Sequence, residues 1–430
     1  MNKFLAKTLQ GDRVVWTIFA LFFFVSMVEM YSASINLVYN SASVIDPILR
    51  HVMFYAVGFV GLLIVQIVDF KIIRMAGYFG LFCSLAMLVF TMLGFGVEQA
   101  NAARWIEIGG FQFQPSEFAK LSLIVVVADI IERFQNEELQ AKYYWWLATI
   151  VMAVCGLIFL ENFSTAALLF AVVMLMMWIG EIKSKRILAT LGVVVGFVAI
   201  VLVIAMVIPE DVYYQSDSKA LKLFERAYTW VARIENFAGN DAETVNKFKI
   251  TDSNYQENHA QMAIARGGLV PRPGTSVESN YLPEAFSDFI FAIIVEELGA
   301  IVAILIILFY LMLLFRAGKV ARQSDSLFAA ILVIGVTMMI VMQAFIHVGV
   351  SVHLGPVTGQ PLPLISRGGT SILINCIYFG LIINITRYIQ QQQMVMQMTP
   401  KKEEAPTNES LTESVVETSS ESNVEEIKEL

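Results

Sequence analysis

The sequence has little charge for its length. Only 15% of its 430 residues are charged, whereas 57% are hydrophobic. A water-soluble protein of this size needs far more charge to cover its surface. The polar residues gather into short islands between long apolar runs, so the composition excludes a soluble globular protein and indicates a bundle of membrane helices. The net charge of −8 comes mostly from a Glu-rich C-terminal segment, and no nucleic-acid partner is expected.

Cysteine and histidine are also scarce. The three cysteines, Cys83, Cys155 and Cys376, all lie within apolar runs and show no CxxC spacing. Disulfides and a thiolate metal site are therefore not expected, and small core side chains account for these residues. The four histidines are scattered without an HExxH pattern. The sequence thus predicts no metal site built entirely from protein side chains, and it identifies no cofactor.

Apolar runs long enough to cross a bilayer follow one another along the chain. Each crossing needs about twenty apolar residues in a helix. The first run, 14–34, has no small-residue cleavage site after it, so we expect a transmembrane helix there and not a signal peptide. The fold class is therefore an all-α polytopic membrane protein with about ten transmembrane helices. The predicted spans are 14–34, 51–69, 76–96, 116–132, 145–161, 163–181, 187–208, 286–315, 327–352 and 364–386.

Lysine and arginine residues concentrate in alternate connections between these spans. With the N-terminus in the cytoplasm, most of them fall inside, and the short outer loops hold only Arg50, Arg104 and Arg367. Cytoplasmic loops are enriched in positive charge. The bias therefore predicts that both termini are cytoplasmic.

Two segments differ from the rest of the chain. A large outer loop, residues 209–284, separates helices seven and eight. Within it, residues 218–237 have the spacing of an amphipathic helix, which lies either at the membrane surface or on the bundle as a lid. Residues 1–390 form the predicted transmembrane domain. Residues 391–430 are the predicted disordered, acidic cytoplasmic tail, because this segment has too few apolar residues to build a core.

Charged residues in or beside a membrane span are costly, which makes each a candidate for function. Glu117 and Lys120 are three residues apart, just after Pro115, and can pair on one face of a helix. Such a pair serves either the structure or a substrate site. Arg104 could bind a phosphate and Trp105 could stack on a sugar, although tryptophan is also a common interfacial anchor.

A second acidic position lies at the start of the eighth span. Asp288 is expected to begin that helix at the outer surface, with Glu296 and Glu297 deeper in the membrane. A carboxylate in that position can accept a proton from a sugar hydroxyl as a general base. It can equally cap the N-terminus of the helix.

Two further segments combine polar residues with glycine. Residues 254–269 read as a short amphipathic helix that includes Arg266 and ends at Gly267-Gly268. Residues 353–371 are dense in glycine and proline and contain Ser366 and Arg367. This composition predicts a bent re-entrant loop, which membranes tolerate where it lines a cavity or is buried in protein. A capped helix and a structural loop are the alternatives to functional roles.

These four segments, in the order in which they follow one another along the chain, resemble the signature blocks of the FtsW/RodA/SpoVE group, the SEDS glycosyltransferases. The resemblance covers nearly all of the transmembrane region. It implies a bacterial cytoplasmic-membrane protein with ten transmembrane helices that polymerises lipid II, an undecaprenyl-diphosphate-linked disaccharide peptide. It also implies a class B penicillin-binding protein as transpeptidase partner, together with other division proteins.

The resemblance assigns roles to particular residues. The family's essential aspartate, in a Pro-Glu-x-x-x-Asp-Phe-Ile-Phe block, falls on Asp288. Its Arg-Trp and Gln-Pro-Ser-Glu-x-x-Lys residues fall on Arg104, Trp105, Glu117 and Lys120. The block from Leu282 to Ala285 is more similar to division-type members than to elongation-type members, which tend to carry Pro-Glu-Gln.

The sequence also departs from the family pattern. Phe286-Ser287 replaces His-Thr before the aspartate, so that position offers no histidine partner for a base. His347 stands where asparagine is common, and Arg367 where tyrosine is common. Between the fifth and sixth helices, Glu161-Asn162-Phe-Ser164-Thr165 replaces Pro-Asp-x-Gly-Thr, which weakens any role for an aspartate there.

The resulting hypothesis is an inverting glycosyl transfer with Asp288 as base. The departing diphosphate needs positive charge, with or without a divalent cation. The candidates for that charge are Arg104, Lys120, Arg226, Arg266 and Arg367. The alternatives are an elongation-type polymerase, a transporter or flippase for a lipid-linked precursor, and a non-enzymatic scaffold of the division machinery.

Overall fold

The computed structural model describes residues 10–37, 45–99, 102–108, 111–135, 137–207, 229–233, 254–282 and 285–398. By its internal contacts the chain divides into two units, Met1–Arg387 and Tyr388–Leu430. All of the sites considered below lie in the first unit.

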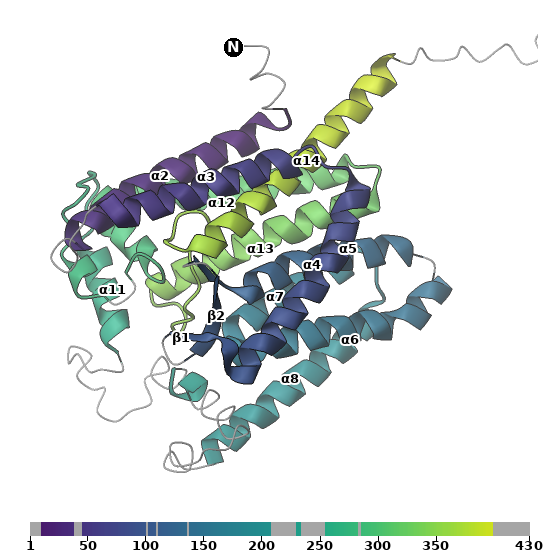
Figure 1. Cartoon of the computed structure of the whole chain (residues 1–430), viewed down its shortest axis with the longest axis horizontal. Helices are drawn as coiled ribbons and strands as arrows, with labels where there is room; N and C mark the ends of the chain where they lie inside the picture. Colours follow the sequence, from purple (N-terminus) through teal and green to yellow (C-terminus); the bar gives the residue numbers. More distant parts are fainter. Residues whose placement is uncertain are drawn as a thin grey trace, which may run out of the picture. The chain divides into compact units, whose positions relative to one another are not determined.

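Long helices make up most of the described chain (Figure 1). They are α2 (Arg13–Leu37), α3 (Ile45–Val65), α4 (Phe70–Phe90), α5 (Pro115–Arg133), α6 (Glu137–Glu161), α7 (Phe163–Ile179), α8 (Ser184–Val207), α11 (Tyr255–Arg266), α12 (Ile290–Arg322), α13 (Leu327–Ser351) and α14 (Gly369–Met398). A π-helical turn, Thr91–Phe95, extends α4, and a 3-10 turn, Glu278–Asn280, follows α11. The predicted helical class is confirmed.

Within the described part of the chain, eight helices are long and apolar enough to cross a membrane. They are α2, α3, α4 with its π-helical turn, α6, α8, α12, α13 and α14. Helix α7 has only 17 residues, and α5 carries several charged side chains. The total of ten spans therefore stays a prediction.

Local sequence signals explain several helix boundaries. Pro115 occupies the first turn of α5, where its missing N–H costs nothing. Asn162 separates α6 from α7, and its side chain accepts a hydrogen bond of 3.2 Å from the Thr165 N–H as an N-cap. Ser326 caps α13 in the same way through Ala329 N–H at 3.4 Å. The predicted split after Glu161 is therefore present.

Among the boundaries that differ from the prediction, three lie next to the candidate site or the predicted tail. Helix α12 begins at Ile290 and not at 286, because residues 285–288 form a turn. Helix α14 begins at Gly369 and not at 364, because the chain before it is bent. It then continues to Met398, into the predicted tail, whereas residues 399–430 lie outside the described part.

A small antiparallel sheet lies between α4 and α5, which the helical prediction did not include. Its strands β1 (Val97–Gln99), β2 (Ala102–Ile108) and β3 (Phe111–Phe113) are arranged in the order β1-β2-β3. Trp105 pairs with Val97, and Ile106 pairs with Phe113. The Gly109-Gly110 pair between β2 and β3 is a hairpin signal that could have revealed the last two strands.

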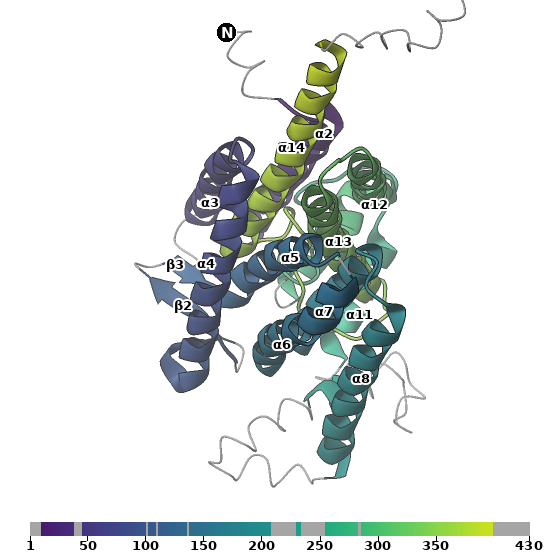
Figure 2. The same cartoon turned by 90° about the vertical axis from the view of Figure 1, so that its right-hand side faces the viewer.

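Helices α5 and α13 form the centre of the first unit. Helix α5 packs against α4, α6, α7 and α13, and α13 also packs against α7 and α12 (Figure 2). Nearly every residue of α5 is buried, including its charged residues Glu117, Lys120 and Asp129. Buried charges of this kind need partners, and those partners define the polar networks described next.

Candidate functional site

Asp288 lies in a turn directly before α12. The turn spans residues 285–288, and the residue at the helix N-cap position is Phe289, so the expectation that Asp288 begins the helix is wrong. Its carboxylate is half-buried and accepts a 3.0 Å hydrogen bond from the Ser287 hydroxyl. Asp288 therefore lies one residue before the N-cap position, and its chemical role stays a prediction.

The connection between α13 and α14, residues 352–368, passes close to Asp288. Gly359 in this connection has a φ of +62°, a conformation that favours glycine. A Cβ atom at this position would lie only 3.3 Å from Asp288 Oδ2. The backbone can therefore pass beside the carboxylate because residue 359 has no side chain.

Hydrogen bonds from the surrounding helices fix this connection. Along residues 360–365, five backbone carbonyls accept side-chain donors from α2, α3, α12 and α13. The pairs are His347 Nδ1 to Gln360 O at 2.7 Å, Gln343 Nε2 to Pro361 O at 2.8 Å, Tyr310 Oη to Pro363 O at 2.6 Å, Tyr55 Oη to Leu364 O, and Ser26 Oγ to Ile365 O at 3.0 Å. Irregular backbone is thereby satisfied inside the protein, as the predicted bent loop requires.

Ser366 and Arg367 attach the connection to the Asp288 turn. The Ser366 hydroxyl donates to Ser287 O at 2.7 Å and accepts from Leu362 N–H at 2.7 Å. The Arg367 N–H donates to Phe286 O at 2.8 Å, while the residue as a whole is exposed. Ser366 therefore positions the turn, and the Arg367 side chain reaches away from the packed core.

The Glu117–Lys120 pair reaches the same connection through one further residue. Lys120 Nζ lies 2.7 Å from Glu117 Oε1, and both side chains are at least 95% buried. The ammonium also contacts Gln343 Oε1 at 3.5 Å, and Gln343 in turn donates to Pro361 O. The pair thus supports the connection that borders Asp288.

Arg233 lies within residues 218–237, the segment with the spacing of an amphipathic helix, and was not among the candidate site residues. Its guanidinium donates to Val357 O at 2.9 Å, in the connection beside Asp288. Burial lowers the pKa of Arg233, and the negative charge of Asp288 opposes that change. An arginine whose charge interacts with Asp288 can stabilise an anion next to the carboxylate.

His347 is a second residue whose position was not foreseen. Its Nδ1 faces Gln360 O, and its Nε2 accepts a 3.3 Å hydrogen bond from Phe291 N–H in the first turn of α12. With one nitrogen donating and the other accepting, the ring matches a neutral imidazole. It joins α13, the connection and α12, although nothing in the sequence pairs these segments.

The other predicted site residues that the structure describes belong to β2 and α11. Trp105 is half-buried in β2, and the backbone of Arg104 lies in the same strand. Arg266, at the end of α11, forms an ion pair with the buried Glu278, which also bonds His259 at 2.6 Å. Arg226 lies outside the described residues. Among the residues described, no group of three or more His, Cys, Asp or Glu side chains could hold a metal ion.

Comparison with known proteins matches this chain to one family. The family model FtsW/RodA/SpoVE, described as cell cycle protein, matches residues 12–391. A probable peptidoglycan glycosyltransferase FtsW of Enterococcus hirae is 31% identical over 312 residues, covering 71% of this chain and 74% of that protein. The protein of the same description from Trichlorobacter lovleyi is 29% identical over 373 residues, covering 84% and 91%.

Solved structures share the fold. A chain of a peptidoglycan synthase complex, described as coordinating polymerization and crosslinking, superposes with a TM-score of 0.65 at 20% identity, covering 89% of this chain and 99% of that one. The rod shape determining protein RodA of Thermus thermophilus gives 0.60 at 21% identity, covering 88% and 97%. Because the family model spans most of the sequence, the chain is an integral membrane protein that belongs to the FtsW/RodA/SpoVE family.

Proposed function

We propose that Asp288 is the general base with which this chain, a peptidoglycan glycosyltransferase, polymerises lipid II. The observation that carries this proposal is the setting of the Asp288 carboxylate. It is half-buried in a turn that Ser366 fixes, it faces Gly359, and its charge interacts with Arg233. A general base needs a fixed position and access to the substrate proton, and this setting supports both.

The reaction joins two lipid-linked disaccharides. The 4-hydroxyl of an acceptor GlcNAc gives its proton to the Asp288 carboxylate. Its oxygen forms a bond to the anomeric carbon of MurNAc on the donor, and the bond from that carbon to the undecaprenyl diphosphate breaks. Attack from the face opposite the leaving group inverts the anomeric carbon. The electron pair of the broken bond leaves with the diphosphate, where positive charge stabilises it.

The proposed binding residues differ in how much positive charge they can offer. Lys120 is neutralised by Glu117, and Arg266 pairs with Glu278. Arg233, whose charge interacts with Asp288, and Arg367 are both exposed and are therefore the better-placed cations in the described region. Glu117, Lys120 and Ser366 act in this proposal by shaping the site, whereas Arg104, Trp105, Arg226 and Arg266 contact the substrate further out, with or without a divalent cation.

The substrate and partners follow from the same proposal. Lipid II is the donor and the acceptor, and a class B penicillin-binding protein cross-links the product with other division proteins in the assembly. The relatives described as FtsW favour the division role over the elongation role. The chain then lies in the bacterial cytoplasmic membrane with both termini inside, which the distribution of lysine and arginine supports. Residues 1–390 form the catalytic domain, and 391–430 the cytoplasmic tail.

One experiment separates this proposal from its alternatives. The purified full-length chain, in detergent and in liposomes, is given labelled lipid II together with a class B penicillin-binding protein. Glycan polymer is the expected product. Translocation of lipid II across the liposome without polymer would instead identify a flippase, and neither product would indicate a scaffold.

A further inference from the structure

Helix α12 is broken at Gly299. This residue has φ +81° and ψ 167° inside the helix, and its position is crowded, because a Cβ there would lie 2.8 Å from Gly268 O. The segment after α11 satisfies the freed backbone groups: Ala300 N–H donates to Gly268 O at 2.9 Å, and Arg272 N–H donates to Glu297 O. Broken helices in membrane proteins form ion sites where their backbone and acidic groups meet.

Glu297 holds this segment on one side and faces α2 on the other. Its carboxylate accepts hydrogen bonds from Gly274 N–H at 3.1 Å and Ser276 N–H at 3.3 Å. It also accepts from the Ser32 hydroxyl of α2 at 2.6 Å. The neighbouring Glu296 binds the same segment through Ser276 and Val277. Glu297 thus lies where the break in α12 meets α2.

Glu29 lies one helical turn before Ser32 on α2, on the same face of the helix as the serine that bonds Glu297. Its side chain is fully buried, and neither carboxylate oxygen has a hydrogen-bond partner among the described residues. Burying a carboxylate without a partner is among the costliest arrangements in a protein. A second carboxylate nearby raises that cost further.

Two kinds of ligand could neutralise such a pair, a proton or a cation. A proton on Glu29 turns the carboxylate into a carboxylic acid, whose O–H still needs an acceptor. Neither oxygen of Glu29 has a hydrogen-bond partner among the described residues, so protonation alone leaves a buried donor unsatisfied. A hard cation binds each oxygen at about 2.0–2.6 Å and can link carboxylates that do not touch each other.

We propose that Glu29, Ser32 and Glu297 form a binding site for a divalent cation between α2 and the break in α12. Two carboxylates match the charge of such an ion, the Ser32 oxygen adds a third hard ligand, and water would fill the remaining positions, as is usual for Mg²⁺. The site joins α2 to the broken helix and to the 267–277 segment. It is distinct from Asp288 and from any ion that accompanies a diphosphate there.

The test measures Mn²⁺ on the purified full-length chain without substrate. Electron paramagnetic resonance after gel filtration counts the bound ions, and Mg²⁺ competes for them. The expected result is one Mn²⁺ per chain, released by Mg²⁺, with none in Glu29→Gln. Mg²⁺ should also raise the melting midpoint of the wild type by at least about 3 °C over Na⁺ at equal ionic strength, because a ligand stabilises the state that binds it.

Two controls locate the ion. Glu107→Gln removes an exposed acid in β2, and Asp288→Asn alters the catalytic turn, so both should retain the Mn²⁺. If Glu29→Gln does not fold, Ser32→Ala replaces it, and weaker Mn²⁺ binding supports the site whereas unchanged binding overturns it. Absence of Mn²⁺ from the wild type, or equal retention by Glu29→Gln, would show that Glu29 carries a proton and no cation.

Discussion

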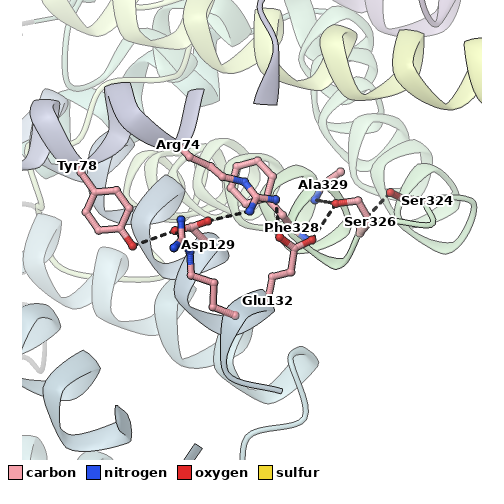
Figure 3. A network of polar contacts seen from close by, with 9 residues as sticks. Arg74, Tyr78, Asp129, Glu132, Ser324, Ser326, Phe328 and Ala329 are labelled. Carbon is pink, nitrogen blue, oxygen red and sulfur yellow. Dashed lines mark hydrogen bonds and ion pairs between the residues drawn. The ribbon is translucent and has the colours of Figure 1, made fainter. Parts of the chain in front are cut away.

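Polar networks join α5 to α13 at both ends of the two helices. The carboxylates of the first network are paired with arginine side chains, whereas the second network borders the half-buried Asp288. At one end, Asp129 of α5 is fully buried between Arg74 at 3.0 Å, Arg133 at 2.7 Å and the Tyr78 hydroxyl at 2.9 Å (Figure 3). Glu132 accepts from Ser326 Oγ and Phe328 N–H, both at 3.0 Å, and pairs with Arg74. These acids bind three helices together.

At the other end of the two helices, the acid is Asp288, and part of this residue is exposed. Asp288 is half-buried and accepts from a neighbouring serine hydroxyl, and Ser366 holds the backbone of its turn through Ser287 O. Gln343 and the Glu117–Lys120 pair hold the connection beside it. A buried acid paired with two arginines stabilises the fold, whereas a half-buried acid in a fixed turn can take up a proton.

The largest expected effect is on catalysis at the accessible acid. Asp288→Asn removes the proton acceptor while keeping the size of the side chain, so lipid II polymerisation should fall about 100- to 10,000-fold. The melting midpoint should stay close to that of the wild type, because the carboxylate contributes little to packing. Polymer yield and thermal unfolding of the same preparation check both statements. Wild-type yield from the folded variant would remove Asp288 as the base.

The second-largest effect is expected at the Glu117–Lys120 pair, which supports the connection beside Asp288. Lys120→Met leaves the buried Glu117 without its partner, which should cost about 3–5 kcal/mol of unfolding free energy. Adding Glu117→Gln should recover part of that stability. If the double variant also regains polymerisation, the pair is structural; if it is stable but inactive, Lys120 binds the substrate. Additive losses in both assays would show that the two residues are not coupled.

Sequence patterns predicted the parts of this architecture that depend on local signals. The apolar runs, the break at Asn162 and the bent connection before α14 each follow from residues next to one another in the chain. The start of α12 was placed four residues early because the turn at 285–288, Ala-Phe-Ser-Asp, contains no glycine or proline to mark a break before the apolar helix. Local composition does not distinguish a buried turn from a helix.

The contacts around Asp288 depend on tertiary structure, so the sequence alone could not supply them. Arg233 and Val357 are 124 positions apart, and Gln360 and Thr165 are 195 apart, yet each pair is hydrogen-bonded. The family resemblance identified Asp288, Glu117 and Lys120 as a set without showing that Gln343 links the Glu117–Lys120 pair to the connection that borders Asp288. Residues that join distant segments need coordinates, because no periodicity connects them.

A smaller effect is expected at Asp129, the buried acid that pairs with Arg74 and Arg133. Asp129→Asn removes the charge that Arg74 and Arg133 share, but the Arg133 side chain is 56% exposed and can be solvated. The loss should therefore be about 1.5–3 kcal/mol of unfolding free energy, the range of hydrogen bonds to charged groups. Polymerisation per folded molecule should remain near the wild-type rate. A stable Asp129→Asn protein that has lost polymerisation would show that Asp129 serves catalysis, and would contradict its assignment as a structural acid.

The smallest effect is expected at two serines, Ser366 at the Asp288 turn and Ser326 at the start of α13. Ser366→Ala removes the link to Ser287 O, and Ser326→Ala removes the cap of α13 and a donor to Glu132. Each should cost about 1 kcal/mol of unfolding free energy, a typical value for one hydrogen bond or cap. Only Ser366→Ala should slow polymerisation, by about tenfold, because it loosens the turn that orients Asp288. Ser366→Thr keeps the hydroxyl and should restore the rate, which separates the lost hydrogen bond from a change in packing. Equal rates in the Ser366→Ala and Ser326→Ala proteins would mean that the Asp288 turn keeps its geometry without this link, and that the accessible acid is held by the Arg367–Phe286 backbone bond instead.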